Sequence, residues 1–240
     1  MYQLFTNMST FNDDISKWNT ASVSSMRSSF EGSTAFNQPI GGWNVAAVTT
    51  MYQSFKDASV FDQDLSAWNT ASVSSMLGMF DTAGAFNRPI GSWNTARVAS
   101  TNSMFEKATA FNQPIGSWNT AAVTDFAQMF SQAAAFAADI GAWNTASATT
   151  MKQMFGEATA FNADISSWNT ASVSNMRSVF FKAGLFFQQV HTIGGPTCSR
   201  RLCDLASTLL APIPRAGWKL ERVLGYGSEH GLQRRVCLQR

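Results

Sequence analysis

One pattern constrains this chain more than any other: a phrase of 25 residues recurs along most of its length without an insertion. We number the 25 positions of a unit as slots 1 to 25, with a phenylalanine in slot 1. The residues before the first full unit match the end of a unit, because Met1 and Phe5 occupy the slots of Met51 and Phe55. A strict period favours an array in which each unit forms one coil that stacks on the last. The sequence therefore predicts a repeat solenoid over residues 1–190. Its seven full units begin at Phe11, Phe36, Phe61, Phe86, Phe111, Phe136 and Phe161.

Within a unit, the apolar positions predict one short strand and one short helix. In the second full unit, Val48, Met51 and Phe55 are three and four residues apart, which is the spacing of one helical face. Around Ile40, the preceding Pro39 and the following glycine pair disfavour a helix and favour a short extended segment between turns. We therefore expect an α/β solenoid with one short strand and one short helix in each 25-residue repeat.

Two slots hold the same residue in every full unit and predict structural ladders. Slot 8 is always tryptophan, which would form a buried column in which each indole N–H needs one partner. Slot 9 is always asparagine, whose amide can close its own turn or bond the next coil. We favour this turn-closing role over a recognition ladder, because every copy has the same neighbours. The two sets are Trp18, Trp43, Trp68, Trp93, Trp118, Trp143 and Trp168, and Asn19, Asn44, Asn69, Asn94, Asn119, Asn144 and Asn169.

Slot 17 behaves in the opposite way, because its residue changes from unit to unit. Outward positions of a repeat array can vary without disturbing the stacked core, so variation marks candidate partner-facing residues. Mixed small, polar and charged side chains suit a protein or glycan partner, and plain solvated surface is the alternative interpretation. The candidates are Arg27, Tyr52, Leu77, Asn102, Ala127, Lys152 and Arg177.

Charge and residue inventory exclude several classes of function. Residues 1–190 carry nine Lys or Arg against twelve Asp or Glu. This balance does not indicate the basic surface that binds nucleic acid. The same residues contain no histidine, no cysteine and no glycine-rich phosphate loop, so we expect no enzyme, no cofactor and no metal site. The aspartates of slot 4 are not in consecutive coils throughout, which makes a metal-binding row weak. No apolar stretch is long enough to insert into a membrane.

Residues 191–240 lack the repeat and carry eight Lys or Arg against three Asp or Glu. We expect this basic tail to be mostly disordered or spurious, with a short helix covering the last coil as an alternative. His191, Cys198 and Cys203, joined by Cys237 or His230, fit a zinc site only loosely. The chain begins directly in repeat-like sequence, without the basic start and apolar run of a secretory signal peptide, so we expect either an intracellular protein or a chain that lacks its true N-terminus.

The residues from Val48 to Trp68 read V-x-x-M-x-x-x-F-x-x-A-x-x-F-x-x-x-I-x-x-W, with Leu65 in the Ile slot. This order resembles the BspA-like leucine-rich repeat surface proteins, and more specifically the 25-residue W-N/D-T-x-x-V-x-x-M-x-x-M-F repeats of mycoplasma surface lipoproteins. The match covers residues 1–190. The resemblance implies a right-handed leucine-rich-repeat-like coil, display on a cell surface and a role in adhesion. The chain departs from the family because it has no lipobox cysteine and its last part lacks the repeat.

The expected function is therefore non-catalytic protein interaction or adhesion, at a cell surface or outside the cell. A structural or self-associating spacer, acting inside the cell, is the alternative. The threonines of slot 10 also suggest an ice-binding array, although one threonine in each coil, flanked by asparagine, is poor support. These residues are Thr20, Thr70, Thr95, Thr120, Thr145 and Thr170.

Overall fold

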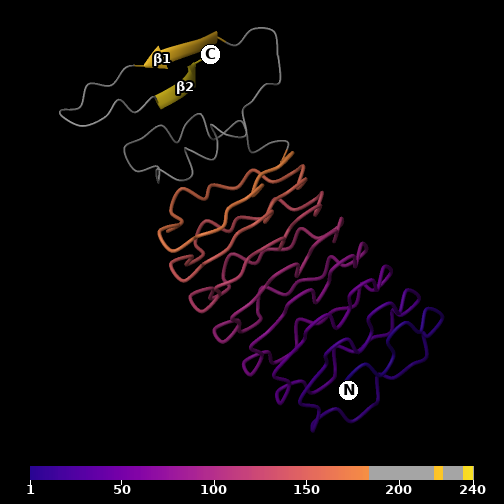
Figure 1. The fold of residues 1–240 in the computed structure, drawn as a ribbon. Helices are drawn as coiled ribbons and strands as arrows, with labels where there is room; N and C mark the ends of the chain where they lie inside the picture. The colour runs from indigo at the N-terminus through magenta and orange to yellow at the C-terminus, as the bar shows by residue number, and fades with distance from the viewer. Residues whose placement is uncertain (184–218, 224–234, 240) are drawn as a thin grey trace. The chain divides into compact units, whose positions relative to one another are not determined.

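The computed structural model describes residues 1–183, 219–223 and 235–239 (Figure 1). The chain divides into two units, Met1–Phe186 and Phe187–Arg240. The second unit contains β1 (Lys219–Val223) and β2 (Arg235–Gln239), which pair in antiparallel fashion with Lys219 opposite Gln239. His191, Cys198, Cys203 and His230 lie outside the described residues. The expectations about a zinc site, a covering helix and disorder in the tail therefore stay predictions.

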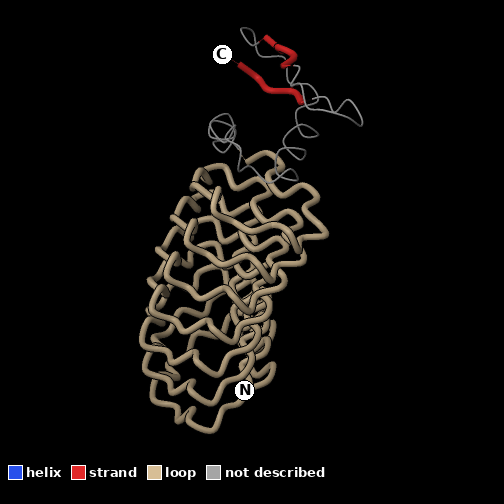
Figure 2. The backbone as a smooth tube through the Cα atoms, turned by 90° about the vertical axis from the view of Figure 1, so that its left-hand side faces the viewer, coloured by secondary structure: helices blue, strands red, loops and turns tan. Residues whose placement is uncertain are grey.

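Residues 1–183 form a stack of coils that follow one another from indigo to orange in Figure 1. Coils 1 to 6 are residues 11–35, 36–60, 61–85, 86–110, 111–135 and 136–160; coil 7 begins at Phe161, and a partial coil precedes coil 1. One parallel β-bridge at slot 15 joins each of these coils to the next, from Ser25 with Thr50 to Thr150 with Asn175. The tube view of Figure 2 shows the same stack as loops and turns throughout.

Aromatic side chains fill the centre of the stack in three columns. Slot 20 of one coil lies on slot 1 of the next, as in Phe80 and Phe86, whose ring centroids are 3.8 Å apart. The same slots also stack between coils, with 5.7 Å between Phe80 and Phe105. The tryptophans of slot 8 form the third column, with 6.5 Å between Trp93 and Trp118. Every coil buries large apolar surfaces against its neighbours, so the hydrophobic effect mainly stabilises the stacking of coils.

The predicted α/β coil is wrong. Residues 1–183 contain no helix, and the strands described in the chain are β1 and β2 of the tail. Slots 18 and 22 of every coil instead adopt the left-handed backbone conformation. At slot 18 these are Gln3, Ser28, Gln53, Gly78, Ser103, Gln128, Gln153 and Ser178, and at slot 22 Asn7, Gly32, Asp57, Thr82, Lys107, Gln132, Glu157 and Lys182.

The two left-handed residues, four positions apart in each coil, explain why no helix forms. Backbone amides that would bond four residues back in a helix instead point at the next coil. The amide of Gln53 donates to the carbonyl of Leu77 at 2.8 Å, and that of Phe55 donates to Met79 at 2.9 Å. The turns keep slots 16, 20 and 23 on the inside, so the apolar spacing of three and four residues resembles that of a helix. The segment around Ile40 is likewise a turn rather than a strand, closed by the Trp43 amide on the Ile40 carbonyl.

Candidate interaction surface

Most polar slots hold similar residues from coil to coil because their side chains bond neighbouring coils. The Asn37 side-chain oxygen accepts a hydrogen bond from the Asp62 amide of the next coil at 2.9 Å. The hydroxyls of slot 14 donate to the preceding coil, as Ser74 does to the Thr49 carbonyl at 3.1 Å. These slots face solvent, but their hydrogen bonds to neighbouring coils restrict which residue types they hold.

The asparagines of slot 9 close turns within their own coils. The Asn94 side-chain oxygen accepts a hydrogen bond from the Ala96 amide at 3.1 Å. The same bond recurs in every full coil, and all seven asparagines are exposed, at Asn19, Asn44, Asn69, Asn94, Asn119, Asn144 and Asn169. Asparagine suits this role because its short amide bonds the backbone two residues on.

The tryptophans of slot 8 bond the preceding coil with their indole nitrogens. Each indole N–H of coils 2 to 7 donates to the carbonyl of slot 5 in the coil before it, at distances of 3.0–3.2 Å. These six side chains are buried, whereas Trp18 in coil 1 is 44% exposed. The set comprises Trp43, Trp68, Trp93, Trp118, Trp143 and Trp168.

The threonines of slot 10 are buried, and their hydroxyls also serve the stack. The Thr70 hydroxyl donates to the Asn94 carbonyl of the next coil at 3.0 Å, and Thr20, Thr95, Thr120 and Thr145 make the equivalent bond. A hydroxyl that is buried and bonded to protein cannot order water at a surface. The ice-binding interpretation of this slot is therefore wrong.

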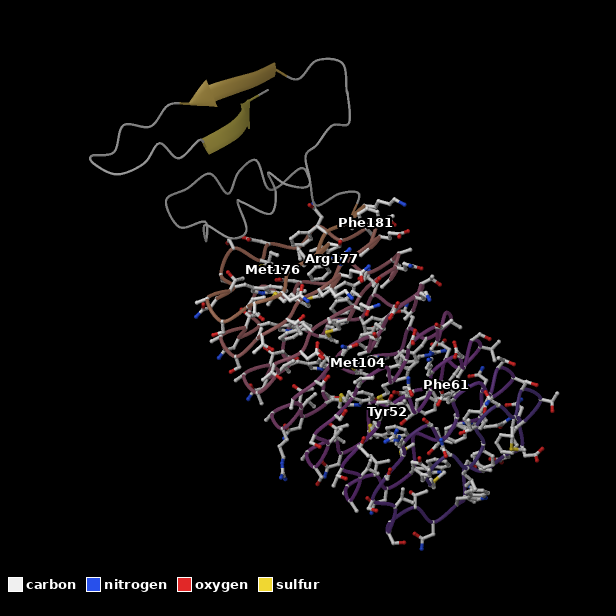
Figure 3. All side chains as sticks on the ribbon, viewed as in Figure 1. Tyr52, Phe61, Met104, Met176, Arg177 and Phe181 are labelled. Carbon is white, nitrogen blue, oxygen red and sulfur yellow. The ribbon has the colours of Figure 1, made fainter. Side chains whose placement is uncertain are left out.

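One surface is shaped mainly by backbone hydrogen bonds between coils, and we call it the variable face. It consists of slots 17, 18, 21 and 22, which alternate with the inward slots 16, 19, 20 and 23. Backbone hydrogen bonds such as Lys107 amide to Ser131 carbonyl, 2.8 Å, fix its shape and leave most of its side chains free to differ. Figure 3 labels Tyr52, Arg177 and Phe181 of this face.

The slot 17 candidates all lie on the variable face, although their exposure differs. Arg27 and Arg177 are exposed, and Ala127 is buried with 7% of its surface accessible. The Arg27 guanidinium lies 4.5 Å from the centre of the Tyr52 ring and 5.8 Å from that of Tyr2. This Tyr–Arg–Tyr column places aromatic rings and a cation together at one end of the face. Tyr52, Leu77, Asn102 and Lys152 are half-buried.

Sequence reasoning missed slots 18, 21 and 22, and slots 21 and 22 carry most of the charge on this face. Lys56 lies 3.8 Å from Asp81, and the Gln128 amide donates to Glu106 at 3.2 Å. Burial raises the pKa of the Asp81 carboxyl and nearby Glu106 adds to the effect, although the Thr82 hydroxyl and Lys56 act against it. The predicted helix obscured these slots, because it would have spread them around its circumference. Their variation between copies was readable in the sequence, as it was at slot 17.

The described part of the chain provides no group of three or more His, Cys, Asp or Glu residues that could hold a metal ion. Within the same residues, no helix is long and apolar enough to span a bilayer. The aspartates of slot 4 close local turns, as in Asp64, whose carboxylate accepts the Ser66 amide at 2.8 Å.

Comparison with known proteins identifies the repeat. Neither a curated protein nor a solved structure matches the chain. A family model matches in two overlapping copies, over residues 1–115 and 86–193. These ranges contain the whole coil stack. The chain therefore belongs to the family described as Mycoplasma protein of unknown function, DUF285.

Proposed function

We propose that this chain is a non-catalytic interaction module whose variable face binds another protein. One observation carries the proposal: the coils are most alike in the slots whose side chains bond a neighbouring coil throughout the stack, and they differ on the variable face, which backbone hydrogen bonds mainly shape. At slot 17, for example, Tyr52, Leu77 and Asn102 occupy equivalent positions in three consecutive coils. A surface that only kept the array soluble would not need such varied chemistry.

The composition of the face supports a protein partner. Tyrosine and arginine are enriched at the energetic centres of protein interfaces, and here Arg27 lies between Tyr2 and Tyr52. Exposed apolar side chains on the face are confined to its two ends, where Tyr2 is 58% and Phe181 is 42% exposed. Charges of both signs lie between them, which suits specific pairing with a complementary surface.

A photo-crosslinking experiment tests the face directly. The full chain is produced in its natural cells with a photo-reactive amino acid at Tyr52 or at Arg177. The matched controls carry the same amino acid at Lys17 and at Arg97, which are exposed and lie outside the variable face. We expect a discrete crosslinked protein from the first pair and none from the controls. Equal adducts from both pairs, or adducts from the controls alone, would remove the variable face as the binding surface.

The resemblance to BspA-like surface proteins supports a place on the cell surface and a role in adhesion. Brief protease treatment of intact cells tests this part separately. Repeat peptides released while cytosolic markers stay intact would agree with surface display. Peptides that appear only after lysis would favour the alternative of an intracellular spacer, which the near-identity of the coils supports.

A further inference from the structure

Two opposite charges lie at equal distances on either side of Gln132 on the variable face. Lys107, Gln132 and Glu157 occupy slot 22 in coils 4, 5 and 6. With about 4.8 Å between neighbouring coils, Lys107 and Glu157 are separated by roughly 10 Å, too far for an ion pair. Neither side chain forms an ion pair with any residue that the structure describes. Both charges are therefore available to an outside partner.

The other charges of the face are also distributed unequally about coil 5, with the opposite sign on each side. On one side, Asp81 and Glu106 place carboxylates in coils 3 and 4. On the other, Lys152, Arg177 and Lys182 place cations in coils 6 and 7. Coil 5 between them carries no charge on the face, since its four residues there are Ala127, Gln128, Ser131 and Gln132. Lys107 offsets Glu106 in coil 4, and Glu157 offsets Lys152 in coil 6. The face therefore has a net negative charge at coil 3, none at coils 4 to 6 and a net positive charge at coil 7.

We propose that the partner of the variable face is a second copy of this chain, bound with its coils running in the opposite direction. The proposal rests on the proposed function of that face. A two-fold axis that runs across coil 5, in the plane of contact, places Lys107 of each copy on Glu157 of the other. The same axis places coil 3, with Asp81, against coil 7, with Lys182. A two-fold axis forms each of these contacts twice.

The opposite-direction arrangement is favoured over one in which the two stacks run in the same direction. A two-fold axis along the stack would bring slot 17 of each coil against slot 22 of the same coil in the other copy. Arg177 would then face Lys182, a contact between like charges. This contact offsets the favourable contact of Lys152 with Glu157 in coil 6. Across coil 5, in contrast, no two like charges of the same slot fall opposite one another in the described coils. Glu106 lies one slot from Glu157 of the other copy, and Lys107 beside it directly faces that Glu157.

Analytical ultracentrifugation of the full chain tests the pairing through a charge swap. We expect a reversible monomer–dimer equilibrium at low ionic strength that weakens as salt is added, because salt screens exposed pairs. Lys107→Glu and Glu157→Lys should each raise the dissociation constant by about tenfold or more, since each creates two repulsive contacts. The double variant, with the charges exchanged, should restore the wild-type constant. Lys17→Glu and Arg97→Glu, which reverse exposed charges elsewhere, should leave it unchanged.

The outcomes separate this inference from the function on which it rests. A chain that stays monomeric at every concentration, or a double variant that stays as weak as the singles, would overturn the pairing of copies. If crosslinks from Tyr52 to another protein persist in that case, the variable face still binds a partner and only its identity as a second copy fails. Circular dichroism of each variant verifies that the coil stack is intact.

Discussion

The indole Nε1–H of Trp93 donates a hydrogen bond of 3.0 Å to the carbonyl oxygen of Leu65 in the preceding coil. The indole is buried and so is Leu65, so neither polar group can exchange its partner for water. Because the bond spans two coils, it stabilises the stack rather than the turn in which the tryptophan lies. The constancy of slot 8 follows from this contact and from the stacked ring column.

Replacing Trp93 with phenylalanine should therefore destabilise the stack. The Leu65 carbonyl would lose its partner, and the smaller ring would leave unfilled volume in the core. We expect Trp93→Phe to lower the free energy of unfolding by about 2–3 kcal/mol, measured by urea denaturation. Trp18→Phe is the matched control, since Trp18 is 44% exposed; it should cost about 0.5 kcal/mol or less. Equal losses at the two positions would show that ring packing, not the coil-to-coil bond, dominates.

The glycines of slot 6 allow a close approach that the neighbouring Gly42 does not need. A Cβ at Gly91 would lie 2.5 Å from the Pro114 carbonyl oxygen of the next coil. A Cβ at Gly42 would meet no atom within 4 Å. We expect Gly91→Ala to cost about 1–3 kcal/mol through the backbone shift it forces. Gly42→Ala should be neutral or stabilise by up to about 1 kcal/mol, because it restricts the unfolded chain. Thermal unfolding of the two variants measures both effects, and a stable Gly91→Ala would mean that coil spacing adjusts freely.

The period and the core could be read from the sequence, whereas the local backbone could not. Large apolar residues recur at fixed slots, and this pattern shows which side chains lie inside. It does so for any backbone conformation between those slots. Gln53 illustrates the limit, because its left-handed φ of 50° belongs to a residue that rarely adopts that conformation. Bonds to the next coil hold it there, and these long-range bonds leave no local signal. The apolar spacing therefore predicted a helix where turns lie, and the variable face was found at slot 17 alone.

The left-handed residues make a separate prediction at Gln153, whose φ is 54°. A β-branched residue is particularly disfavoured in this conformation, so Gln153→Val should cost about 1–2 kcal/mol. Gln153→Gly should be close to neutral, because relief of backbone strain offsets the larger entropy of the unfolded chain. Gly78 already occupies the equivalent slot in coil 3. Chemical denaturation of both variants measures the difference, and a tolerated valine would contradict the assigned backbone.

Two aspartates should change the stability of the stack with pH in opposite directions. Hydrogen bonds from the amide and the hydroxyl of Ser66 lower the pKa of Asp64. Its contribution is present above the unfolded pKa, about 3.9, and is lost as pH falls through the lowered folded pKa. Burial raises the pKa of Asp81, chiefly because desolvation disfavours its charged form. Its contribution is complete below the unfolded pKa and is lost as pH rises through the raised folded pKa.

The asparagine variants separate these two effects. At neutral pH, Asp81→Asn should raise the free energy of unfolding, because the amide has no charge to desolvate and can still accept the Thr82 hydroxyl. The gain should disappear below about pH 4, where the unfolded carboxyl is also protonated. Asp64→Asn should lower the free energy of unfolding at neutral pH, and this loss should shrink on acidification. Urea denaturation at the two pH values measures both. A less stable Asp81→Asn at neutral pH would show that Lys56, 3.8 Å from the carboxylate, outweighs the cost of burial.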